Sequence, residues 1–204
     1  MSDRRPGSGD GLGEAGDEAA AGGRVGEFWT PRDTADLVAW LAQHGQTVAT
    51  AESLTGGLVV AALTDPPGAS AVVRGGIVAY HSDIKAALVG VSPQVLAGGA
   101  VQAQVALELA AGARRQLRAT WGVGTTGVAG PEPADGQPVG TVFIAVCGEN
   151  AAGEGVDSVV ALNLAGDRAA IREATVRSAV ALLGETARGG VVDRPGPASR
   201  PPQR

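Results

Sequence analysis

The sequence predicts an α/β protein, a single domain in which a mixed β-sheet is flanked by helices. Helical and strand-like patterns alternate in the earlier part of the chain, which is typical of parallel strands joined by helices. Two later strand-like segments, residues 139–146 and 156–164, follow each other directly, which favours an antiparallel pair. Hydrophobic residues make up 44% of the 204 residues and aromatic residues only 3%, so Val, Leu, Ile and Ala are expected to build the core.

The domain is expected to lie between two polar tails. Residues 1–27 are rich in Gly, Ala, Asp and Glu, and residues 189–204 are rich in Pro. Both segments lack apolar periodicity, so we predict that they are disordered and dispensable. Residues 28–188 remain as one domain of ordinary size.

The first helix is expected to start after Thr30. Thr30 is a candidate N-cap, Pro31 suits the first helical position, and Asp33 lies in the first turn. Gly45 is expected to end this helix. Its apolar face consists of Leu37, Val38, Trp40 and Leu41.

The following elements alternate. We expect a strand at residues 47–51, a helix at 58–63, a turn at 65–68 and a strand at 72–80. Gly75 and Gly76 lie inside this second strand, where glycine indicates a bulge or a close backbone approach.

The second half of the chain begins with a short helix at Ser92-Pro93. A longer helix at residues 102–118 has Val105, Leu109 and Ala113 on one apolar face. A strand at 121–128 precedes the two strands named above, and the last helix spans residues 167–187. Its inward positions are expected to be Ile171, Ala174, Ser178 and Ala181.

Charge and cysteine content exclude several classes of protein. The formal net charge of -5 argues against a broad nucleic-acid-binding surface. A single cysteine, Cys147, excludes a disulfide framework and a cysteine-based zinc site, and two histidines cannot build a His-rich centre. Cys147 lies in an apolar run and is expected to be a buried structural thiol. We therefore expect neither a metal nor a cofactor.

No segment of the chain is typical of a targeting signal or a membrane span. Residues 1–26 have no apolar core, and no run of about 18 apolar residues occurs. We expect a cytoplasmic protein without a membrane partner. The sequence leaves open whether it forms a homo-oligomer.

The lysine content is unusual. The chain has fifteen arginines and one lysine, Lys85, and its only tyrosine, Tyr80, lies five residues earlier. Arg stays protonated, whereas Lys can lose its proton when it is desolvated. Composition alone is compatible with two interpretations: a surface lysine that remains by chance, or a position where a guanidinium would not serve.

Two common motifs are matched only in letters, and a third is absent. Residues 122–127 spell G-x-G-x-x-G, but the following residues, V-A-G-P-E-P, cannot open the helix that a dinucleotide site needs. A Walker A loop needs G-K-[ST], and the only lysine follows Ile84. Residues 82–85 spell S-x-x-K, but the second lysine of penicillin-binding enzymes is absent, so we interpret this match as accidental.

Three other segments carry groups capable of chemistry, and each has a structural alternative. Residues 51–57, A-E-S-L-T-G-G, place Ser53 at a helix start, either as a nucleophile beside free N–H groups or, like Thr55, as a helix cap. Residues 80–85 hold either a functional Tyr–Lys pair or a half-buried Tyr and a solvated Lys. Residues 125–131 form either a loop that closes on a ligand or a tight turn.

Taken together, these segments resemble the CinA C-terminal domain family, also called nicotinamide-nucleotide amidohydrolases, in its stand-alone form. The resemblance covers most of residues 30–187. Its motifs are A-E-S-L-T-G-G at 51–57, L-T-D-P-P-G-A-S at 63–70, G-G-I-V-A-Y-H-S-D-I-K at 75–85, T-G-V-A-G-P at 126–131, P-V-G-T-V-F-I-A-V at 138–146 and G-D-R-A-A-I-R at 166–172. Several separate motifs in the right order make the match specific.

The resemblance implies hydrolysis of the carboxamide of nicotinamide mononucleotide, giving nicotinate mononucleotide and ammonia without a cofactor. Ser53 is favoured as the nucleophile, with Ser70 as the alternative. Lys85 is the expected base, with a pKa lowered by burial, and Tyr80 is expected to hold its amine or relay a proton. The expected substrate-binding residues are Thr55, Gly56, Gly57, Thr126, Gly127, Gly130 and, for the phosphate, Arg168.

Two departures from the family pattern are visible. Leu54 stands where the family often has Cys, and residues 132–136 read E-P-A-D-G where the family loop is often Gly-rich. The second departure is a place where substrate fit can change. The alternative function is a non-catalytic protein of the same fold that binds a nucleotide or phosphate ligand or acts as a regulatory partner.

Overall fold

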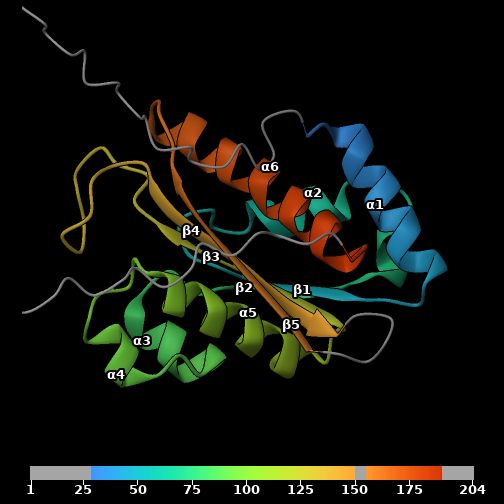
Figure 1. Ribbon diagram of the computed structural model, residues 1–204, viewed down its shortest axis with the longest axis horizontal. Coiled ribbons are helices and arrows are strands. Elements are labelled where there is room, and N and C mark those ends of the chain that lie inside the picture. Colours follow the sequence, from blue (N-terminus) through green and yellow to red (C-terminus); the bar gives the residue numbers. More distant parts are fainter. Residues whose placement is uncertain (1–28, 150–154, 190–204) are drawn as a thin grey trace, which may run out of the picture.

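The computed structural model describes residues 29–149 and 155–189, and these form one five-stranded sheet between two layers of helices (Figure 1). The strand order is β2-β1-β3-β4-β5. β1 pairs in parallel with both β2 and β3, whereas β4 is antiparallel to β3 and to β5. The strands are β1 (Val48–Glu52), β2 (Val73–Val78), β3 (Trp121–Gly127), β4 (Thr141–Glu149) and β5 (Gly155–Asn163). The predicted mixed α/β sheet is confirmed.

The helices divide between the two faces of the sheet (Figure 1). One face carries α1 (Pro31–Gln43), α2 (Leu58–Thr64) and α6 (Arg168–Ala187), and the other carries α3 (Ser82–Ile84), α4 (Pro93–Leu96) and α5 (Ala103–Leu117). A short 3₁₀ turn, η1 (Ala69–Ala71), precedes β2. A single π-helical turn, η2 (Lys85–Val89), continues α3 and was not anticipated from the sequence.

The first helix begins as predicted. The hydroxyl of Thr30 accepts a hydrogen bond from the Asp33 amide, and the Asp33 carboxylate accepts one from the Thr30 amide at 2.8 Å. This reciprocal capping box satisfies two N–H groups that the helix itself cannot pair. Gly45, with φ of +62°, follows the C-cap residue His44.

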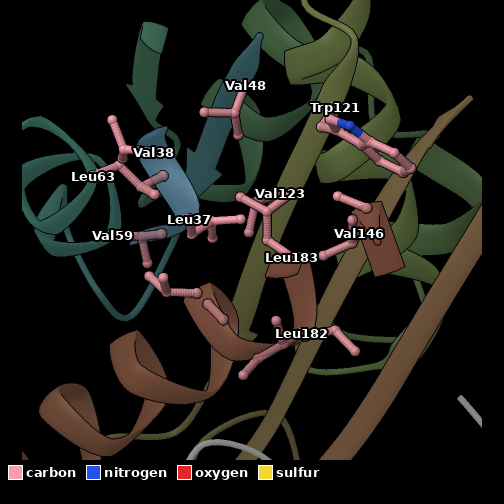
Figure 2. Packing of buried hydrophobic residues seen from close by; sticks show 14 of the residues in the cluster. Leu37, Val38, Val48, Val59, Leu63, Trp121, Val123, Val146, Leu182 and Leu183 are labelled. Carbon is pink, nitrogen blue, oxygen red and sulfur yellow. The ribbon is translucent and has the colours of Figure 1, made fainter. Parts of the chain in front are cut away.

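The larger hydrophobic core lies between the sheet and α1, α2 and α6 (Figure 2). Successive strand residues point to opposite faces, so Val48 of β1 enters this core while its neighbour Ala49 faces the α5 side. Trp121 is fully buried here, and its indole N–H donates to the Gln46 side chain at 2.8 Å. Cys147 is buried on the other face, and burial raises the pKa of its thiol to about 11, in line with a structural role.

Glycines bring α5 close to the backbone of β3. An ideal Cβ at Gly122 would lie 2.0 Å from the Ala110 carbonyl oxygen, and one at Gly124 would lie 2.2 Å from that of Ala106. The G-x-G-x-x-G letters therefore belong to a strand that packs under a helix, and the rejection of a dinucleotide loop is confirmed. Gly112 of α5 makes the same close approach to the η2 turn, where a Cβ would lie 2.1 Å from the Val89 oxygen.

The glycines of β2 fit both expectations from the sequence, a bulge and a close backbone approach. The pairing register with β1 shifts near the start of β2, which marks a bulge or irregularity there. A Cβ at Gly76 would meet Thr50 Oγ1 at 2.6 Å and Val60 Cγ1 at 2.8 Å. Glycine is therefore required at this position because a side chain of α2 and one of β1 already fill the space.

The last helix differs slightly from the prediction. Ile171, Ser178 and Ala181 are buried, but Ala174 is only half-buried and Thr175 takes the buried position beside it. The predicted tails, residues 1–27 and 189–204, lie outside the described residues apart from Gly189.

Candidate functional site

A pocket opens where the three parallel strands end. Parallel strands bring their carboxyl ends to one edge of a sheet, which is where open α/β sheets bind ligands. Ser53 directly follows β1, Tyr80 follows β2, and Thr126 and Gly127 end β3. The cavity has a volume of about 270 Å³. Its lining includes Ser53, Leu54, Tyr80, His81, Ser82, Lys85, Ala100, Thr126, Gly127, Gly130, Glu132, Asp135 and Arg168.

Lys85 is a buried cation in the lining of this pocket. Its side chain is 1% exposed, and its Nζ donates to the Tyr80 carbonyl oxygen at 2.9 Å. Burial lowers the pKa of Lys85, and the nearby charge of Asp135 partly offsets this effect. No carboxylate in the described part of the chain lies within salt-bridge distance of the amine. The interpretation of Lys85 as a solvated surface lysine is therefore wrong.

Tyr80 and Arg168 meet at the mouth of the pocket. Tyr80 is 57% exposed, and its hydroxyl accepts a hydrogen bond from Arg168 Nη2 at 2.9 Å. Arg168 Nη1 donates to the Gly130 carbonyl oxygen at 2.8 Å. Among the described residues, the guanidinium forms no ion pair, so its positive charge is available to an anion.

Ser53 is held by its backbone and presents a free hydroxyl. Its amide donates to the Thr125 carbonyl oxygen at 3.0 Å, and its side chain is 9% exposed. The hydroxyl bonds to no other described group, Lys85 Nζ included. The amides of Leu54 and Thr55, which follow it, likewise donate to no described acceptor.

The start of α2 is occupied by a carboxylate of the protein itself. Glu52 is 1% exposed, and its Oε2 accepts hydrogen bonds from the amides of Gly57 at 2.9 Å and Val59 at 3.0 Å. Its Oε1 accepts from the Val60 amide at 2.8 Å and from the Thr50 hydroxyl at 3.0 Å. These helix amides are therefore not free to bind an anion, and neither Ser53 nor Thr55 caps the helix.

Three residues expected to bind substrate do not line the pocket. The Thr55 hydroxyl is buried against that of Thr125 at 2.8 Å, and the Gly57 amide donates to Glu52. The guanidinium of Arg172 donates to the Leu54 and Thr55 carbonyl oxygens at 3.0 and 2.9 Å, close to where a Cβ of Gly56 would lie. Thr55, Gly56 and Gly57 thus shape the loop that presents Ser53.

Ser70, the alternative nucleophile, lies elsewhere. It is exposed in η1, which precedes β2, whereas Tyr80 follows β2. A strand of six residues spans about 20 Å, so the length of β2 separates Ser70 from the pocket. Of the two serines that the sequence suggested, the structure places only Ser53 in the pocket.

Some lining residues were missed. Ser82 shares a helical turn with Lys85, so the S-x-x-K letters that were interpreted as accidental do place both side chains at the pocket. Ala100 joins two walls: its carbonyl oxygen accepts from the Thr126 hydroxyl at 2.7 Å, and its amide donates to Asp135 at 2.6 Å. For Glu132 and Asp135, the only sequence feature that pointed to the pocket was the E-P-A-D-G departure from the family pattern.

Two further properties concern the described residues as a whole. Within residues 29–149 and 155–189, no three His, Cys, Asp or Glu side chains gather in a way that could hold a metal ion. No helix in the same ranges has the length and apolar character needed to cross a membrane.

The fold and the pocket define an α/β protein with a polar site built around a buried lysine, at the edge where its parallel strands end. Comparison with known protein families identifies the family to which the chain belongs. This chain belongs to the CinA C-terminal domain family, whose model matches residues 32–187. The resemblance suggested by the motifs is thereby confirmed.

Relatives and solved structures agree with this assignment. A CinA-like protein of Frankia casuarinae is 49% identical over 144 residues, which are 70% of this chain and 32% of the relative. A competence/damage inducible protein of Agrobacterium tumefaciens matches with a TM-score of 0.65 and 38% identity, covering 74% of this chain and 93% of that one. A CinA superfamily protein of Escherichia coli matches with a TM-score of 0.69 and 32% identity, covering 76% and 90%. The chain spans about a third of the length of the curated relatives it matches.

Proposed function

We propose that this chain is an amidohydrolase that converts nicotinamide mononucleotide and water into nicotinate mononucleotide and ammonia. The main support for the proposal is that the buried Lys85 and Ser53 line one pocket. The resemblance to nicotinamide-nucleotide amidohydrolases indicates the substrate. The Ser53 hydroxyl, the desolvated Lys85 amine and the Arg168 guanidinium, which has no ion-pair partner among the described residues, support the chemistry.

Lys85 is suited to act as a base. A lysine can take a proton only when it is neutral, and desolvation lowers its pKa toward values where the neutral amine is populated. Its hydrogen bond to the Tyr80 carbonyl oxygen fixes the amine at the pocket wall while leaving the nitrogen able to face a ligand. A guanidinium in this place would stay charged.

Ser53 is the proposed nucleophile. Its oxygen attacks the carboxamide carbon, and its proton passes to Lys85 Nζ, either through a water molecule or once the substrate draws the two groups together. The proton then goes to the departing ammonia, and water releases nicotinate mononucleotide from the acyl-enzyme. The amide of Leu54, a residue of the pocket lining, is a donor available for the oxyanion, in place of the α2 amides that Glu52 occupies.

Arg168 is the proposed phosphate ligand. Its guanidinium has only neutral oxygens as partners among the described residues, those of Tyr80 and Gly130. A guanidinium binds phosphate through two parallel hydrogen bonds. Binding of the nucleotide phosphate would therefore replace the neutral oxygen partners of Arg168 with an anion, which accepts stronger hydrogen bonds. Before the nucleotide binds, Tyr80 accepts hydrogen bonds from both cations, from Arg168 through its hydroxyl and from Lys85 through its carbonyl oxygen.

The test is ammonia release from nicotinamide mononucleotide by the full chain. Ser53→Ala is expected to lower kcat by about 10²–10⁴ while binding of the nucleotide, measured by calorimetry, changes little. Ser82→Ala is the matched control, because it removes another hydroxyl from the lining of the same pocket and should cost far less. A nucleotide that binds wild type without release of ammonia would favour the non-catalytic alternative. Equal losses in the two variants would contradict the assignment of Ser53.

A further inference from the structure

The loop that closes one side of the pocket ends in a tight turn. Ala134 and Gln137 exchange two backbone hydrogen bonds, of 3.2 and 2.8 Å. The two residues between them, Asp135 and Gly136, have φ of +52° and +71°. Positive φ at both central positions defines a type I′ turn, for which Asp-Gly is a favoured sequence. This turn brings the Asp135 side chain to the pocket lining, where it contacts the Ala100 amide.

Asp135 ties this turn to another wall. Its Oδ2 accepts a hydrogen bond of 2.6 Å from the Ala100 amide, which lies between α4 and α5. The Ala100 carbonyl oxygen accepts in turn from the Thr126 hydroxyl at the end of β3. The loop after β3 is thus connected through one residue to the strand from which it departs, and all three residues line the pocket.

Asp135 also differs from the other charged groups around Lys85. His81 and Asp83, on the turn before Lys85, are mostly exposed and pair with each other at 2.7 Å. Arg168 is bonded to Tyr80 at the mouth, and Glu132 lines the pocket without a hydrogen bond to a described group. On α5, Glu108 accepts from the Ser92 amide, and Arg115 donates to the Val89 carbonyl oxygen. Asp135 raises the pKa of Lys85 and so opposes the lowering caused by burial.

We propose that Asp135 is a positioning residue of this site. Its carboxylate fastens the loop of residues 131–137 to another part of the pocket lining through the Ala100 amide, and it adds a negative charge to the cavity that Lys85 also lines. The consequence for turnover rests on the proposed function. The electrostatic coupling to Lys85 does not, and it can be measured without a substrate.

The single lysine makes that measurement direct. Protein labelled with ¹³C at the lysine ε-carbon carries one label, in Lys85, so an NMR titration of the full chain reports its pKa without assignment. Two variants separate the two roles. Asp135→Asn removes the charge but keeps an oxygen for the Ala100 amide, and Asp135→Gly removes both. Asn and Gly each tolerate the positive φ of this position, so neither variant strains the turn.

The titration midpoint of Lys85 is expected to move to lower pH in both variants, because the carboxylate stabilises the charged amine. Glu132→Gln is the matched control, since it removes a carboxylate from the same loop, and it should move the midpoint less. An unchanged midpoint in Asp135→Asn, or an equal shift in Glu132→Gln, would overturn the proposed coupling whether or not the protein hydrolyses a nucleotide.

Kinetics test the fastening role. Asp135→Gly is expected to raise KM about three- to tenfold over Asp135→Asn, which corresponds to the loss of one hydrogen bond. The acid limb of the kcat/KM profile should shift to lower pH equally in both, because both lose the same charge. Equal KM values in the two variants would overturn the fastening role. Absence of any ammonia release in wild type, with the NMR shift present, would refute the proposed function and leave the coupling intact.

Discussion

The carboxylate of Glu52 accepts four hydrogen bonds at the start of α2, and replacing Glu52 with Gln should destabilise the protein. Each of its oxygens serves two donors: Oε1 serves Val60 N and the Thr50 hydroxyl, and Oε2 serves Gly57 N and Val59 N. Gln has one oxygen and one NH₂ group. In its best orientation the oxygen keeps Gly57 and Val59, the NH₂ donates to Thr50, and the Val60 amide loses its partner.

The size of the effect follows from these contacts. An unpaired buried donor costs about 1–3 kcal/mol, and two hydrogen bonds lose the extra strength that a charged acceptor gives them. The α2 dipole also loses a compensating negative charge at its N-terminus. We expect the free energy of unfolding to fall by about 3 kcal/mol, which for a chain of this size lowers Tm by roughly 6–12 °C.

Urea unfolding followed by circular dichroism measures this change. Glu173→Gln is the control, because Glu173 is an exposed residue of α6 paired with Arg177 four positions later, and it should change stability by less than about 0.5 kcal/mol. A loss below about 1 kcal/mol in Glu52→Gln would show that the four hydrogen bonds do not hold the start of α2.

Four further outcomes are expected. Lys85→Arg should fold but lose kcat by about 10²–10⁴ with little change in nucleotide affinity, and near wild-type turnover would contradict the role of Lys85 as the base. Lys85→Met should be at least as stable as wild type at neutral pH. Because burial lowers the pKa of Lys85 in the folded protein, the free energy of unfolding of wild type should rise with pH up to the unfolded pKa of about 10.4. This rise should disappear in Lys85→Met. Gly76→Ala should lower the free energy of unfolding by about 1–3 kcal/mol in urea titrations, since its Cβ meets Thr50 and Val60, and an unchanged midpoint would contradict that contact. Dialysis against a strong chelator should leave the rate of ammonia release unchanged; a loss that zinc or manganese restores would contradict the proposed mechanism.

Local sequence patterns predicted most of the fold. The capping box of Thr30 and Asp33 involves residues three apart, so the start of α1 could be recognised without any tertiary contact. The same holds for the apolar face of α5, where Val105, Leu109 and Ala113 are all fully buried. Adjacent strand patterns likewise predicted the antiparallel pairing of β4 with β5.

The site was harder to predict because it depends on contacts distant in sequence. N-cap rules consider the residue at the helix start, so they favoured Ser53 or Thr55 and missed Glu52, which reaches forward five to eight residues from the strand. Ser70 was plausible because it lies ten residues before Tyr80, but those residues include a whole strand. The contact of Asp135 with Ala100 spans 35 residues and leaves no local pattern.

The glycines under α5 determine which walls of the pocket can adapt to a ligand. Gly122 and Gly124 contribute no side chain of their own between β3 and the backbone of α5, and Gly112 lets α5 approach the turn that carries Lys85. Side-chain rotation therefore cannot adjust these contacts, and strand, helix and π-helical turn are expected to behave as one stiff body. The segment of residues 130–137 lies outside this body, so exchange of that segment between relatives is expected to alter selectivity without disturbing the lysine.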